Sequence, residues 1–433
     1  MKFKLSFMLQ TLLVIVYLAV IPLLYSKNTG IFHGYKILTL YGVFGLVFIV
    51  TILFNGDFTE QLKLSFKTFK LERKLMIIAA LFMFISLFSN IAVMKAYVRL
   101  NYVGTPVFFG AGPNYLSIFF YWGCMLLFLA LLPVWHYIKR DWVKYATITS
   151  LIITGLLITY QVFIYDFIEE SRTFLFGFGN SNHAPDPFAI IGLALIIPFL
   201  FSKKIKWVEF IIGIFFFFVV LLTLSRAAFV GLVVSMVFSF VYLGVTKRLE
   251  IKRTLILVLG GLAVLTISIL VLKQIGDTGI IADLQSFLSF LTGERSIASV
   301  SSSRTEAWVA TFDEMNLNPI IWLFGNGQSV FVWETDVNVA LITNVHNMYL
   351  DILFSAGIFV FVIFIVLLVK QFIYALKLAK YDVKNVVLLS AITFILVKWM
   401  FNSLNAVHSP FIIMVFIINS YRYMEYKKTE EVS

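Results

Sequence analysis

Three polar motifs interrupt a chain that otherwise consists mostly of long apolar runs, and they centre on Arg226, Arg304 and His346. A guanidinium is planar and pairs well with phosphate oxygens. A histidine near neutral pH can accept a proton or orient the group that carries it. Two arginines and a histidine on one side of a membrane would therefore suit the displacement of a diphosphate by a hydroxyl.

Arg226 follows Ser225 in the middle of the apolar run 207–245. As a single helix this run would be about 58 Å long, nearly twice the thickness of the hydrocarbon core of a bilayer. We therefore expect the chain to turn at Ser225-Arg226. Two interpretations stay open: Arg226 extends to lipid headgroups at a helix end, or it faces a cavity and pairs with phosphate.

Arg304 is expected to begin a short helix. Ser303 with Glu306 three residues later forms a capping box, and Asn318-Pro319 marks the end of the helix. An arginine at the positive end of a helix costs a few tenths of a kcal/mol, but it reinforces an anion site there. The alternative is an exposed loop arginine. The apolar stripe of this helix is formed by Trp308, Phe312 and Met315.

His346 precedes the apolar run 347–369 and lies at the far end of the same loop as Arg304. Neutral at pH 7 and near a carboxylate such as Asp351, it could accept a proton from a sugar hydroxyl. A structural role and a purely orienting role are the alternatives. No acidic pair is placed to hold a divalent cation, so we expect neither a metal nor another cofactor.

The composition indicates a membrane protein, because only 13% of the residues are charged and 61% are apolar. Such a chain has too little polar surface for a soluble fold of 433 residues. Runs of about 20 apolar residues predict an all-α polytopic protein with about twelve transmembrane helices. They lie at 5–25 (a retained signal anchor), 36–54, 75–95, 116–136, 145–165, 187–202, 207–224, 227–245, 254–272, 347–369, 385–404 and 409–426.

The basic residues predict the orientation. Of 34 Lys and Arg residues, 24 fall in alternate connections, which the positive-inside rule assigns to the cytoplasm together with both termini. This clustering between apolar runs accounts for the net charge of +11 without a nucleic-acid partner. Ten residues break the pattern and could be retained by an anionic substrate: Lys27, Lys36, Lys95, Arg99, Arg172, Arg226, Lys273, Arg295, Arg304 and Lys398.

The predicted helices divide the chain into three parts. Residues 1–272 hold helices 1 to 9, residues 273–346 form a large extracytoplasmic loop with short amphipathic helices, and residues 347–433 hold helices 10 to 12 and a cytoplasmic tail. Within the loop, residues 282–291 have the apolar spacing of a helix that lies on the bilayer surface.

The motifs, in their order along the chain, resemble a known family. They are Leu222-Thr-Leu-Ser-Arg226-Ala, then Ser303-Arg304-x-x-x-Trp308 with Pro319 and Gly325-Asn-Gly327, then Val345-His346-Asn347-x-Tyr349-Leu350 with Gly357-Ile358. They are similar to the motifs of the O-antigen ligase and O-antigen polymerase (Wzy-type) group of bacterial envelope glycosyltransferases. The chain has Ala227 where glycine is frequent in that group.

The resemblance implies a GT-C-like, metal-independent and inverting glycosyltransferase of the bacterial cytoplasmic membrane, with its active site facing outside. It would transfer a glycan from undecaprenyl diphosphate to an acceptor hydroxyl. Arg226 and Arg304 match the diphosphate-binding arginines, and His346 matches the catalytic or orienting histidine. Further substrate-binding residues are expected to be Ser225, Asn347, Tyr349, Arg172 and Arg99. Membrane lipid, a flippase and a chain-length regulator are the other expected partners.

The motifs do not separate a polymerase from a ligase. The composition, rich in Lys, Ile and Phe, resembles proteins of low-GC bacteria, many of which lack lipopolysaccharide, and this favours a polymerase of surface polysaccharide repeat units. A transporter of lipid-linked sugars would carry charges along midplane helices, whereas here Lys398 is the clearest basic residue within an apolar run. A non-catalytic envelope scaffold is the remaining alternative.

Overall fold

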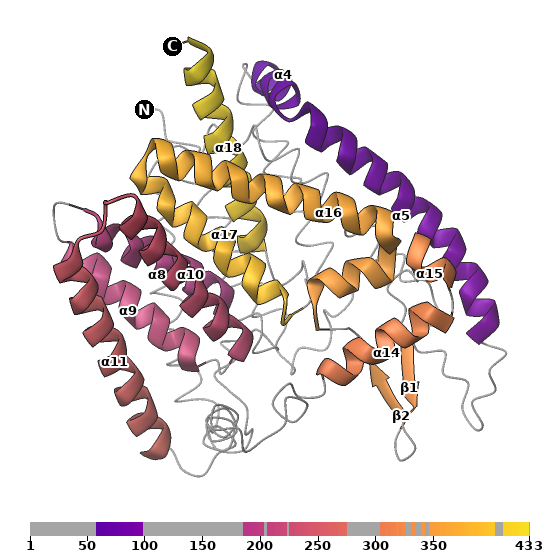
Figure 1. Ribbon diagram of the computed structural model, residues 1–433, viewed down its shortest axis with the longest axis horizontal. Helices are drawn as coiled ribbons and strands as arrows, with labels where there is room; N and C mark the ends of the chain where they lie inside the picture. The colour runs from indigo at the N-terminus through magenta and orange to yellow at the C-terminus, as the bar shows by residue number, and fades with distance from the viewer. Residues whose placement is uncertain are drawn as a thin grey trace, which may run out of the picture.

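The computed structural model describes residues 58–97, 185–202, 206–222, 225–274, 304–317, 319–325, 331–334, 339–342, 346–402 and 410–432. Within these ranges the chain is helical apart from short turns and one two-stranded β-ribbon (Figure 1).

Eight of the twelve predicted spanning segments lie in the described ranges, and each of them is a helix. They are α5 (Lys70–Tyr97), α8 (Pro185–Ile196) with the 3-10 helix η3 (Ile197–Leu200), α9 (Trp207–Leu222), α10 (Arg226–Val245), α11 (Ile251–Gln274), α16 (Met348–Tyr381), α17 (Val386–Trp399) and α18 (Pro410–Val432). By length and composition, α10 and α16 are long and apolar enough to cross a membrane. The other four predicted segments lie outside the described residues, so the number twelve stays a prediction.

The predicted turn at Ser225-Arg226 is confirmed. Helix α9 ends at Leu222 and α10 begins at Arg226. Ser225 is the N-cap of α10, and its buried Oγ accepts a hydrogen bond from Ala228 N at 3.4 Å. A serine cap satisfies one of the backbone N–H groups that the first turn of a helix leaves unpaired.

Helices α10 and α17 pack closely against each other in opposite directions. A side chain at position 231 would lie 3.1 Å from both the ring and the carbonyl of Phe394, so Gly231 permits this approach. Further along, the buried hydroxyls of Ser239 and Ser390 lie 2.5 Å apart. Moving toward the start of α10 therefore means moving toward the end of α17.

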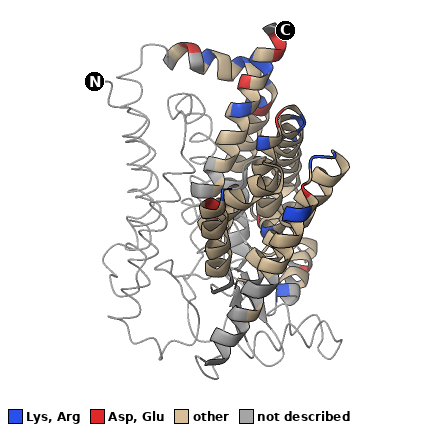
Figure 2. Cartoon of the chain, turned by 90° about the vertical axis from the view of Figure 1, so that its left-hand side faces the viewer, with Lys and Arg blue, Asp and Glu red and all other residues tan. Residues whose placement is uncertain are grey.

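Within the described ranges, the basic residues that the positive-inside rule assigns to one side lie mainly at one end of the bundle (Figure 2). Figure 2 shows Lys and Arg gathered mainly at the end where the C-terminus lies. Lys67 of α4 (Phe58–Thr68) lies 3.7 Å from Glu431, and Lys370 lies 2.6 Å from Glu72. Arg248, which follows α10, donates from Nη1 to Ala379 O near the end of α16 at 3.3 Å.

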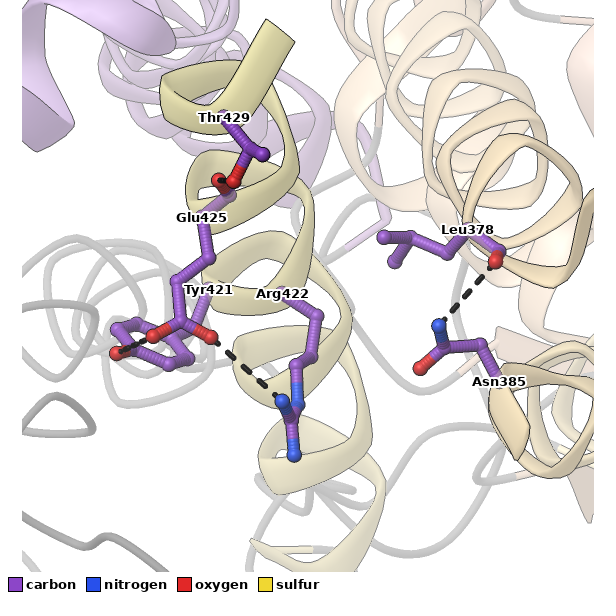
Figure 3. Close-up of polar contacts among 6 residues, drawn as sticks. All are labelled: Leu378, Asn385, Tyr421, Arg422, Glu425 and Thr429. Atoms are coloured by element: carbon purple, nitrogen blue, oxygen red, sulfur yellow. Dashed lines mark hydrogen bonds and ion pairs between the residues drawn. The ribbon is translucent and has the colours of Figure 1, made fainter. Parts of the chain in front are cut away.

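Local hydrogen bonds stabilise the connections at this end. The 3-10 helix η4 (Val383–Asn385) joins α16 to α17, and Asn385 Nδ2 donates to Leu378 O at 3.2 Å (Figure 3). On α18, Glu425 lies 3.6 Å from Arg422, and its carbonyl accepts a hydrogen bond from Thr429 at 3.1 Å (Figure 3).

The segment predicted as a large loop contains helices and a ribbon. Its helices are α14 (Arg304–Leu317) and α15 (Pro319–Phe324), so the predicted break at Asn318-Pro319 is confirmed. The described ranges are helical as predicted, with one short addition in this segment: strands β1 (Phe331–Glu334) and β2 (Val339–Ile342), which pair antiparallel. Both strands are rich in aromatic and β-branched residues, which favour extended structure. The predicted helix at 282–291 lies outside the described residues.

Candidate active site

Gly357 divides α16 into two sections. Its φ of 78° and ψ of 176° lie outside the helical region, in a conformation that is open chiefly to glycine. The outer section, the first nine helical residues 348–356, therefore leaves the line of the longer inner section, residues 358–381, as Figure 1 shows. The prediction of one straight span at 347–369 missed this kink, and it also ended the helix short of Tyr381.

The end of α15 packs directly against this kink. Gly325, which follows α15, has a φ of 77°, and a Cβ at this position would lie 2.3 Å from the backbone of Ser355 and Ala356. A Cβ on Gly357 would lie 2.3 Å from Leu323 O. Two glycines thus permit contact between two backbones, which fixes α15 against the outer section of α16.

An apolar cluster joins α14, α15 and the outer section of α16. Met315 and Ile321 are buried against Leu353 and Phe354, and Trp308 packs beside them. The predicted apolar stripe of α14 is thus confirmed, except that Phe312 at its edge is 37% exposed. The three helical pieces form one packed unit, which carries Arg304 on α14 and His346 directly before α16.

Arg304 begins α14, as predicted, and contacts the end of α17. Its Nη1 donates to Phe401 O at 2.9 Å, and the side chain is half-buried. This hydrogen bond fixes the guanidinium beside the residues that follow α17. An exposed loop arginine, the alternative interpretation, does not fit this placement.

His346 lies next to the same segment. The residue has a φ of 53°, in the left-handed region, and two residues later Met348 N donates to Asn402 O at 3.2 Å. Phe401 and Asn402 are adjacent, so one short segment holds both Arg304 and the start of α16. The sequence placed Arg304 and His346 at the two ends of one loop, and the structure brings them to the same place.

The surroundings of His346 lower the pKa of its imidazole. Burial is the larger cause because it disfavours the charged form, and the positive charge of Arg304 lowers the pKa further. His346 is consequently neutral at pH 7 and able to accept a proton. The expected carboxylate partner, Asp351, is buried one turn into α16, where its backbone N–H donates to Asn347 O at 2.8 Å.

Two of the expected substrate-binding residues stabilise α16 itself. Asn347 is the N-cap, and its Oδ1 accepts hydrogen bonds from Tyr349 N at 3.0 Å and Leu350 N at 3.2 Å. The Tyr349 hydroxyl donates to Leu396 O of α17 at 2.9 Å. Ser225 caps α10 in the same way. Direct contact of these three residues with substrate stays a prediction.

Arg226 is placed by the pairing of α10 with α17. Gly231 lies against Phe394, and the helices run in opposite directions, so the start of α10 lies at the level of Lys398 and Trp399. The backbone of Arg226 is thus close to the segment that holds Arg304 and His346. The course of its side chain, and all of Arg172 and Arg99, lie outside the described residues.

The sequence did not predict the ion pair between Lys398 and Asp186. Asp186 lies in the first turn of α8, Lys398 lies in the last turn of α17, and both are fully buried. Lys398 was flagged as an unusual charge in an apolar run, but its partner is an internal carboxylate instead of a substrate. The carbonyls of Phe401 and Asn402 accept hydrogen bonds from Arg304 and Met348. No pattern in the sequence indicated this role.

The arrangement can stabilise negative charge next to a proton acceptor. Arg304 supplies a fixed guanidinium, and a neutral His346 lies beside it. Within the described ranges no group of three or more His, Cys, Asp or Glu side chains is arranged to hold a metal ion. Independence from metal stays a prediction that needs a direct test.

Comparison with known proteins confirms the family resemblance. Residues 210–365 match the family described as O-antigen ligase. The matched range extends from α9 to the inner section of α16, and it includes Arg226, Arg304 and His346. No curated protein matches the chain significantly.

Proposed function

From the O-antigen ligase domain at residues 210–365, we propose that the chain is a bacterial membrane glycosyltransferase that polymerises a surface polysaccharide. The domain and the apolar helices indicate a membrane protein that acts on lipid-linked glycans. The proposed substrate is an oligosaccharide repeat unit of O-antigen, capsule or exopolysaccharide, carried on undecaprenyl diphosphate. The reaction would take place on the outer face of the cytoplasmic membrane.

One observation carries this proposal: the adjacent carbonyls of Phe401 and Asn402 hold Arg304 and the start of α16 at the same place. A charged donor of hydrogen bonds thereby lies beside a neutral histidine. A diphosphate leaving group needs the charged donor, and an attacking hydroxyl needs the neutral histidine.

In the proposed reaction the acceptor hydroxyl oxygen attacks the anomeric carbon of the donor glycan. The bond between this carbon and the diphosphate oxygen breaks, and the diphosphate leaves with the electron pair. Arg304 and Arg226 stabilise the growing negative charge, while His346 accepts or orients the hydroxyl proton. Inversion at the anomeric carbon follows from a single displacement.

A ligase is the second candidate, since the matched family is described as O-antigen ligase and the match does not distinguish the two roles. It would transfer one complete glycan to a separate lipid or protein acceptor. The same residues serve both reactions, since donor and leaving group are identical and only the acceptor differs.

The test is glycan transfer by purified protein in nanodiscs with EDTA present. The substrate is an undecaprenyl-diphosphate oligosaccharide isolated from the bacterium that produces this protein. A ladder of lengthening lipid-linked products supports the polymerase and its independence from divalent metal. A single transfer to an added acceptor indicates the ligase.

Two results contradict glycan transfer at this site. One is a product that forms equally in His346→Ala. The other is uptake of labelled lipid-linked sugar into vesicles without any new glycosidic bond, which would identify a transporter.

A further inference from the structure

The ion pair between Asp186 and Lys398 is buried without exposure to solvent. The two side chains have exposed fractions of 0% and 1%. Burying two charges costs several kcal/mol per ion, and apolar residues of similar size often give equal or greater stability. Stability alone therefore does not explain why this chain has the pair, which suggests a role in fixing geometry.

The pair joins helices that are far apart in sequence. Asp186 lies in the first turn of α8 and Lys398 in the last turn of α17. Helix α17 also packs along α10 through Gly231 and Phe394. The ion pair thus fixes the last turn of α17 against a second helix, at the level where α10 begins.

Hydrogen bonds connect the ion pair to the candidate active site. Phe401 N donates to Lys398 O at 3.0 Å, which continues the last turn of α17. Phe401 O then accepts the hydrogen bond from Arg304, and Asn402 O accepts the one from Met348 N. The buried charge and both contacts thus lie within the five residues 398–402.

We propose that Asp186 and Lys398 are positioning residues for glycan transfer. By holding the end of α17 against α8, the pair sets the positions of the Phe401 and Asn402 carbonyls. These carbonyls in turn set the position of the Arg304 guanidinium relative to His346. The inference rests on the proposed function for its catalytic consequence, whereas its structural part is measurable without any substrate.

The main test replaces both charges by apolar side chains of similar size, in the variant Asp186→Leu/Lys398→Met. Without a charge left unpaired, this variant is expected to keep the parental Tm. Its kcat for glycan transfer is expected to fall on the order of tenfold to a hundredfold, because small displacements of catalytic groups have effects of this size. The KM for the lipid-linked donor is expected to change much less.

A second readout follows the backbone amide of Met348 by hydrogen exchange in nanodiscs. This amide donates to Asn402 O at 3.2 Å, so its protection reports the position of the segment. The apolar double variant is expected to lose protection there at unchanged Tm. The matched control is Ser239→Ala/Ser390→Ala, which removes a buried polar contact from the same helix α17 and is expected to keep the parental protection and kcat.

The outcomes separate this inference from the proposed function. Parental kcat and parental Met348 protection in the apolar double variant would overturn the inference. If the parent protein forms no glycosidic bond with any acceptor, the proposed function fails, and Met348 protection alone decides whether the pair sets the segment.

A variant that fails to fold is replaced by Asp186→Glu, which keeps both charges and lengthens one partner by a methylene. Reduced kcat and reduced Met348 protection in Asp186→Glu support the inference. Parental values of both overturn it.

Discussion

Replacing Arg304 by glutamine tests the proposed site at its best-defined contact. Arg304→Gln removes the positive charge and the hydrogen bond from Nη1 to Phe401 O. If the guanidinium stabilises the departing diphosphate, its loss is expected to raise the activation free energy by about 2–4 kcal/mol, by analogy with the loss of one oxyanion-hole donor. Since 1.36 kcal/mol corresponds to a factor of ten, kcat is expected to fall roughly 30-fold to 900-fold.

The same variant should change the pH dependence of the reaction. The pKa of His346 lies below its ordinary value of 6.5, first because of burial and second because of the charge of Arg304. A base must be neutral, so the rate falls as the pH drops through this lowered pKa. Arg304→Gln removes the charge of Arg304 and leaves burial, so the pKa of His346 is expected to rise toward 6.5. The acid limb of the pH–rate profile, where the rate falls with falling pH, is expected to move up with it.

The assay is the rate of product formation on the lipid-linked donor in nanodiscs between pH 5 and pH 9, with Arg304→Lys as the matched control. Lysine keeps the charge but not the planar fork of donors. It is expected to keep the acid limb near its parental position and to restore only part of kcat. A near-parental kcat in Arg304→Gln, or an acid limb at the parental pH, would refute the reasoning.

Further substitutions test individual roles. Arg226→Ala is expected to lower kcat roughly 30-fold to 900-fold by the same argument, as measured by the product ladder. His346→Ala is expected to abolish the ladder while binding of labelled donor persists. Asn347→Ala should lower stability by about 1 kcal/mol through loss of the cap, whereas Asn347→Asp should keep the parental Tm. Gly357→Ala should cost about 2 kcal/mol or more because of its positive φ and the approach of Leu323 O, and thermal unfolding measures this.

Acid stability follows from the same histidine. The folded protein holds His346 with a lowered pKa, so the unfolded chain binds the proton more readily as the pH falls through 6.5. This residue is therefore expected to favour folding above pH 6.5 and to lose that contribution as the pH falls below it. In His346→Gln, Tm is expected to depend less steeply on pH between 5 and 7 than in the parent.

Local patterns were sufficient to predict much of the helical framework. The turn at Ser225-Arg226 followed from the excessive length of one apolar run, and the start of α14 at Arg304 followed from the capping box. The break at Asn318-Pro319 followed from the chemistry of proline. Each of these signals lies within a few residues of the feature that it predicts.

Features that depend on contacts between distant segments could not be predicted in this way. The Lys398 partner is Asp186, 212 residues away, and no local pattern links them. The kink at Gly357 also depends on a contact with another segment, because Leu323 O lies where a Cβ would stand. A single glycine within an apolar helical pattern is usually tolerated, so the sequence did not predict a kink there. Asn347 is different: an asparagine before an apolar run is a recognised N-cap signal, and reading it would have given this residue a structural role.

The contact between Gly325 and Gly357 restricts how this part of the chain can change during evolution. Each missing side chain makes room for the main chain of the other segment, and neither residue can be made smaller to compensate for a substitution at its partner. A library of single substitutions should therefore find both positions nearly intolerant, without suppressors at the other position. Lineages that descend from this protein would then keep both glycines, or lose the contact and rebuild the end of α15 together with the outer section of α16.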